Sequence, residues 1–95
     1  MSSNQAQRIE KADIKKLKPL LRDNLKTEAE KRLRFEKLKK AMVLGNNYKS
    51  KCTIVFEAVD GVKHVETTIW MADEMYIVLK GGIALPIACI RDVIV

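Results

Sequence analysis

The dipeptide Asp60-Gly61 lies between two runs in which apolar and polar residues alternate, CTIVFEAV and VKHVETTIW. It is a strong signal for a two-residue hairpin turn, because glycine adopts the positive φ angle that such turns need. Taking Val59 and Val62 as the flanking pair places Phe56 opposite Val65 and gives the hairpin one apolar face. Residues 51 to 71 are therefore constrained to an antiparallel strand pair.

The outer face of this predicted hairpin contains the only histidine of the chain, His64, opposite Glu57. A general base oriented by a carboxylate is one interpretation, but no nucleophile or second acid is placed to complete a catalytic group. A surface pair is the alternative, and opposite charges there contribute a fraction of a kcal/mol.

The same register places Trp70 opposite Lys51. A large aromatic residue there either marks a contact surface or packs against the helix or the aliphatic stem of the lysine.

The remaining strands follow from turn signals. Gly81-Gly82 separates two apolar runs and is a turn, because the longer glycine-rich phosphate-binding pattern is absent. Pro86 cannot donate to a strand ladder, so its strand has an open edge or ends there. The predicted strands are 51–59, 62–71, 75–80, 83–88 and 91–95.

Residues before the strands have helical spacing. We expect a short helical turn up to Lys18 and a long helix from Pro19 to about Val43, ended by Leu44-Gly45-Asn46-Asn47. A capping box in TEAE, with Thr27 and Glu30, leaves open a break at Thr27. Residues 1–8 are expected to be a flexible tail, so 1–18 form a flexible or partly helical extension and 19–95 form one helix-plus-barrel domain.

The predicted helix has two apolar stripes, one through Leu21, Leu25, Ala29 and Leu33 and the other through Phe35, Leu38 and Met42. One stripe is enough to dock on a sheet. The second either reflects a helix that wraps a small domain or meets another chain. The candidate contact residues are Phe35, Leu38, Met42 and Trp70.

Positive charge is confined to the first half of the chain. Residues 1–51 contain 15 Lys and Arg against 6 Asp and Glu, whereas residues 52–95 contain 3 against 6. Residues that could bind nucleic-acid phosphates lie on the helix: Lys31, Arg32, Arg34, Lys37, Lys39 and Lys40. A solvated face is the alternative, because Glu28, Glu30 and Glu36 lie four residues before Arg32, Arg34 and Lys40.

Several classes of protein are disfavoured. No apolar run is long enough to span a membrane. Cys52 and Cys89 lie in strand-like apolar runs, where cysteine is a small buried hydrophobe, so we expect a cytoplasmic, reduced protein. With one histidine and no CxxC motif, a structural zinc site within one chain is not expected, and no cofactor is predicted.

These observations predict an α+β fold, with an N-terminal helical segment followed by a five-stranded antiparallel sheet or small SH3-like barrel. This order resembles the SH3-like and Sm-like small β-barrels over residues 30–95. In the Sm-like family the last strands of neighbouring subunits pair into rings, a part that CIRDVIV could take, although the family's RNA-binding motifs are not recognisable. We expect a non-enzymatic interaction module that forms homo-oligomers. The alternative is a nucleic-acid-binding protein that uses the basic helix.

Overall fold

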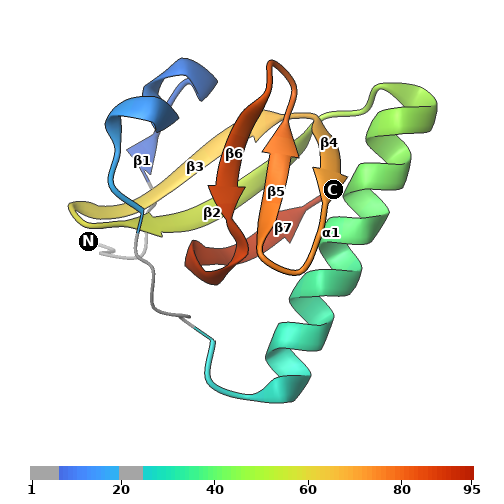
Figure 1. Cartoon of the computed structure of the whole chain (residues 1–95), viewed down its shortest axis with the longest axis horizontal. Helices are drawn as coiled ribbons and strands as arrows, with labels where there is room; N and C mark the ends of the chain where they lie inside the picture. The colour runs from blue at the N-terminus through green and yellow to red at the C-terminus, as the bar shows by residue number, and fades with distance from the viewer. Residues whose placement is uncertain (1–6, 20–24) are drawn as a thin grey trace.

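The structure is a computed structural model, and it describes residues 7–19 and 25–95 (Figure 1). The elements are β1 (Gln7–Arg8), the 3-10 helix η1 (Lys11–Lys16), α1 (Glu28–Tyr48), β2 (Cys52–Ala58), β3 (Gly61–Thr67), β4 (Ile69–Ala72), β5 (Tyr76–Leu79), β6 (Ile83–Pro86), the 3-10 turn η2 (Ile87–Cys89) and β7 (Ile90–Ile94). The predicted α+β class is confirmed, and α1 precedes every strand except β1. Of the expected flexible tail at residues 1–8, residues 1–6 lie outside the described part, whereas Gln7 and Arg8 form β1 and pair with β3, so the tail prediction is wrong for these two residues.

The strands form two sheets rather than the single antiparallel sheet expected from the sequence. One has the order β1-β3-β2-β7, with β1 parallel to β3, and the other has the order β4-β5-β6. The two sheets do not close into a barrel within the described residues. The predicted strand 62–71 is divided at Thr68, whose carbonyl oxygen accepts a hydrogen bond from the Lys80 N–H (2.9 Å) and whose hydroxyl donates to the Ser50 carbonyl oxygen (3.3 Å).

The register of the β2-β3 hairpin differs from the predicted one by two residues. Val59 and Asp60 occupy the turn with negative φ angles, and Gly61 follows with φ of 137°. Ala58 therefore pairs with Gly61, and Phe56 pairs with Lys63 instead of Val65. The loop resembles the three-residue hairpin loops in which a type I turn is followed by a glycine with a positive φ angle. An even shift keeps every side chain on its predicted face.

Helix α1 starts at the predicted break. The Thr27 hydroxyl oxygen accepts a hydrogen bond from the Glu30 N–H (3.1 Å), and the Glu30 carboxylate accepts one from the Thr27 N–H (3.2 Å). The expected start at Pro19 is wrong, because Pro19 forms an isolated β-bridge with Ala58. Residues 20–24, including the stripe residue Leu21, lie outside the described part.

The predicted stop at Leu44–Asn47 is also wrong, because α1 continues to Tyr48 and ends at Lys49 with φ of 55°. Gly45 has a packing role instead. A Cβ atom at this position would lie 2.7 Å from Cγ2 of Thr68 and 3.0 Å from the carbonyl oxygen of Ile69. Glycine is therefore the residue that lets the helix approach the backbone where β3 passes into β4.

Helix α1 packs against β4 and β7, along one side of the two sheets (Figure 1). Its buried face consists of Arg34, Leu38, Ala41 and Gly45. Leu38 is completely buried in the core between the sheets, whereas Leu33, from the other predicted stripe, is 54% exposed. Ile14 of η1 is also buried in this core, so the described part of the N-terminal extension packs onto the sheets.

Candidate interaction surfaces

The structure divides the basic residues of the helix into two groups. Lys37 forms an ion pair with Asp92 (2.8 Å), and Lys31 forms a longer one with Glu28 (3.7 Å). Arg34 is buried, and its guanidinium donates a hydrogen bond to the carbonyl oxygen of Ile90 (3.0 Å). Burial leaves Arg34 unable to reach a phosphate in this fold.

The other three basic residues, Arg32, Lys39 and Lys40, are exposed. Lys39 lies over the Phe35 ring, with 5.7 Å between its Nζ atom and the ring centroid. A cation at that distance gains a weak attraction to the ring face. The predicted basic helix therefore offers a smaller free cationic surface than its sequence indicates.

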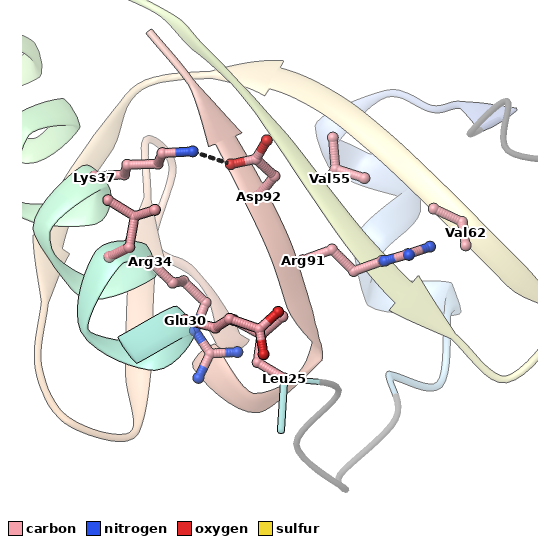
Figure 2. A pocket seen from close by; sticks show the side chains of 9 residues that line it. Leu25, Glu30, Arg34, Lys37, Val55, Val62, Arg91 and Asp92 are labelled. Atoms are coloured by element: carbon pink, nitrogen blue, oxygen red, sulfur yellow. Dashed lines mark hydrogen bonds and ion pairs between the residues drawn. The ribbon is translucent and has the colours of Figure 1, made fainter. Parts of the chain in front are cut away.

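A groove of about 440 Å³ lies between α1 and strands β2 and β7 (Figure 2). It is lined by Leu25, Glu30, Leu33, Arg34, Lys37, Val55, Val62, Arg91 and Asp92. Lys37 reaches across it to Asp92 from the helix, and Arg91 extends from β7 in the direction of Val62 (Figure 2).

The charged groups of the groove have structural partners. Arg91 lies 3.8 Å from the Glu57 carboxylate. Glu30 caps the helix, and hydrogen bonds from the Thr27 hydroxyl and N–H hold the pKa of its carboxyl group below its usual value. The contacts that join the helix to β7 are the Lys37–Asp92 ion pair and the hydrogen bond from Arg34 to the Ile90 carbonyl oxygen. The groove is therefore best explained as a packing seam.

The shifted register also separates the predicted histidine pair. Glu57 lies opposite Val62, and His64 lies opposite Val55. Because Glu57 contacts Arg91, it is an ion-pair partner and does not orient an imidazole. This arrangement gives no support to His64 as a general base oriented by a carboxylate.

Both cysteines are buried free thiols, as the sequence predicts. Burial raises the pKa of Cys52 to about 11 and that of Cys89 to about 12. The Cys89 thiol also donates a hydrogen bond to the Pro86 carbonyl oxygen (3.1 Å). Since the thiolate is the nucleophile, neither thiol is suited to covalent chemistry at neutral pH.

A thiol-specific reagent should therefore react at least about a hundredfold more slowly with the native protein than with the protein in denaturant, because both thiolates are disfavoured by burial. The measurement is the release of a chromophoric thiol product at pH 8, with and without urea. Reaction of either cysteine at the rate of the unfolded chain would contradict this placement.

The four predicted contact residues have different environments. Leu38 belongs to the core and is therefore not available to a partner, while Met42 is half-buried and packs against the same core. Phe35 lines a small pocket with Ile87. Trp70 is 48% exposed in β4, which pairs with β5, so Trp70 does not lie opposite Lys51 as predicted.

The outer face of the β4-β5-β6 sheet was missed by the sequence reasoning. One cross-strand row consists of Met71, Val78 and Ala84, and the next pairs Tyr76 with Pro86. Ile77 and Leu79 alternate with these residues on the buried face. An antiparallel sheet with one face in solvent normally has polar side chains on that face, whereas these are all apolar or aromatic.

No protein-family model, curated protein or solved structure matches this chain. Within residues 7–19 and 25–95, no His, Cys, Asp or Glu side chains form a group of three or more that could hold a metal ion. The same residues contain no helix with the length and apolar character needed to cross a membrane.

Proposed function

We propose that this chain is a non-enzymatic interaction module that self-associates through the outer face of the β4-β5-β6 sheet. The proposal rests mainly on the apolar rows of that face. Met71 is 57% exposed and Tyr76 is 47% exposed, with Met75 (68%) and Trp70 (48%) beside them. Burying these side chains against a second copy removes apolar surface from water, which is the principal driving force of protein association.

The size of the surface supports a partner of protein size. Exposed parts of four large side chains amount to several hundred Å², within the range in which apolar patches mark interaction sites. Stable interfaces bury about 800 Å² per partner, so the surrounding polar residues must supply the remainder. A two-fold axis through the face would use the same residues in both copies, which is the commonest symmetry of homo-oligomers.

The edge of β6 is a poor alternative for self-association. The Ile87 N–H donates to the Met75 carbonyl oxygen (2.9 Å), so by the alternation of an antiparallel ladder Ala84 and Pro86 direct their backbone groups to the open edge. Pro86 has no N–H to donate at this edge, so pairing with a further strand is disfavoured. Face-to-face contact is therefore favoured over continuation of the sheet.

The fold type, the non-enzymatic role and the cellular location of the protein are part of the same proposal. We propose that β2 to β7 are an open variant of the small SH3-like or Sm-like fold, supported by the 3-10 turn η2 before β7 and the return of β7 to pair with β2. A non-enzymatic role is supported by the structural contacts of Glu57 and the raised pKa values of both thiols. Two buried free cysteines are in keeping with a reducing, cytoplasmic location.

Solution mass tests the self-association. The wild type should have at least twice the monomer mass at micromolar concentration, and Met71→Glu should be monomeric, because a carboxylate in the apolar row would lose its water on association. Val43→Glu is the matched control, since Val43 is 49% exposed and does not belong to the face of α1 that packs against the sheets. It should leave the mass unchanged. Light scattering that gives a monomer for the wild type would refute the proposal.

A further inference from the structure

Tertiary contacts link the three chain segments that carry Lys11, Lys49 with Lys51, and Lys80. The Nζ atom of Lys11 lies 3.4 Å from the position that a Cβ of Gly81 would take, next to Lys80 in the β5-β6 turn. The Lys80 N–H donates to the Thr68 carbonyl oxygen (2.9 Å). The Thr68 hydroxyl donates to the Ser50 carbonyl oxygen (3.3 Å), and Ser50 is flanked by Lys49 and Lys51.

Figure 1 shows these segments along the upper side of the view, with η1 on the left, the β5-β6 turn in the middle and the end of α1 on the right. We call Lys11, Lys49, Lys51 and Lys80 the lysine end. Lys49, Lys51 and Lys80 are exposed, and Lys11 is partly exposed.

None of these four ammonium groups forms an ion pair with a carboxylate of the described residues. The neighbouring Asp13 carboxylate accepts a hydrogen bond from the Glu10 N–H (3.2 Å) within η1. Like charges repel one another, so an anionic ligand would lower the electrostatic cost of placing four lysines in these neighbouring segments.

An exposed aromatic residue stands at this end. Tyr48 is the last residue of α1, is 73% exposed and directly precedes Lys49. An aromatic ring among lysines is the combination that single-stranded nucleic acid requires, with cations for the phosphates and a flat surface on which a base can stack.

The backbone at Lys49 supplies a separate observation. Lys49 is the one non-glycine residue with a positive φ angle in the described part of the chain. Glycine or asparagine is the usual residue at such a helix end, because a side chain is strained there. A lysine held in this conformation is the kind of local strain that is found at binding sites.

We propose that the lysine end binds single-stranded nucleic acid, with its four ammonium groups contacting phosphates and Tyr48 stacking on a base. No base-reading groups are required, so binding is independent of sequence. This site is distinct from the basic face of α1, where Arg34 and Lys37 are held in contacts with β7.

Fluorescence anisotropy with a labelled single-stranded oligouridine, measured at two salt concentrations, tests the proposal. Lys49→Gln, Lys51→Gln and Lys80→Gln together should reduce the affinity at the lower salt concentration by at least about tenfold. They should also reduce the slope of log K against log salt by about 2, at about 0.7 for each lost phosphate contact. The matched control, Arg32→Gln with Lys39→Gln and Lys40→Gln, removes the same formal charge and should change the affinity less than about threefold.

Two further variants separate the phosphate contacts from stacking and from folding. Tyr48→Leu should weaken binding at least about fivefold, whereas Tyr48→Phe should not. Lys49→Gly removes a cation and relieves the strain of the left-handed backbone conformation. It should therefore weaken binding without lowering the melting temperature.

Three outcomes would overturn the proposal. They are the absence of oligouridine binding by the wild type at the lower salt concentration, equal losses in the two triple variants, and displacement of oligouridine by polyglutamate as effectively as by unlabelled oligouridine. The last of these would assign the surface to acidic peptides instead.

Discussion

Gly45→Ala should lower the free energy of unfolding by about 2 kcal/mol, although the same exchange in an exposed helix raises it by roughly 0.5–1 kcal/mol. The sign reverses because the new methyl group would lie 2.7 Å from Cγ2 of Thr68 and 3.0 Å from the Ile69 carbonyl oxygen. Denaturant unfolding of the two proteins measures the difference.

A second substitution identifies the atoms responsible. Thr68→Ser removes the Cγ2 atom and retains the hydroxyl that donates to Ser50. Combined with Gly45→Ala, Thr68→Ser should restore part of the lost stability. The double-mutant cycle should therefore give a favourable coupling free energy between the two substitutions. A Gly45→Ala protein more stable than the wild type would show that α1 does not approach the strand backbone this closely.

Leu38→Ala should destabilise the protein by about 2–4 kcal/mol, because it empties volume in the core that the surrounding side chains fill only in part. Leu33→Ala provides a chemically identical control on the same helix, with an expected loss below about 1 kcal/mol. Leu38 is 0% exposed and Leu33 is 54% exposed. Equal losses, measured by thermal or urea unfolding, would mean that the buried face of α1 is assigned incorrectly.

The face of each hairpin strand could be predicted from the sequence, but the pairing of the strands could not. Alternation from Cys52 to Ala58 fixes the buried side, and a two-residue shift leaves it unchanged. The exact register depends on the turn geometry around Gly61, and Asp-Gly is compatible with more than one loop type.

The end of the helix was missed because local and tertiary reasons for a glycine have the same sequence signal. Gly45 followed by two asparagines is typical of a helix end, whereas in the structure it allows close approach to Thr68 and Ile69. The capping box at Thr27 was predicted correctly, since its contacts join residues only three apart.

The two candidate surfaces differ in how far the sequence predicts them. The run YIVL has apolar residues at alternate and at intervening positions, a pattern that indicates a strand with two apolar faces. That signal was present in the sequence. By contrast, the segments that carry Lys11, Lys51 and Lys80 are linked only by tertiary contacts, and nothing in the spacing of these lysines predicts a common surface.

The emission of Trp70 tests directly whether the β4-β5-β6 face is covered by a second copy. Trp70 is the only tryptophan of the chain and is 48% exposed beside that face. In concentrated wild-type protein its emission maximum should lie at shorter wavelength than in the Met71→Glu monomer, and it should move to the monomer value on dilution. Val43→Glu should behave as the wild type. An emission maximum that is the same in wild type and Met71→Glu, at every concentration, would contradict the proposed interface.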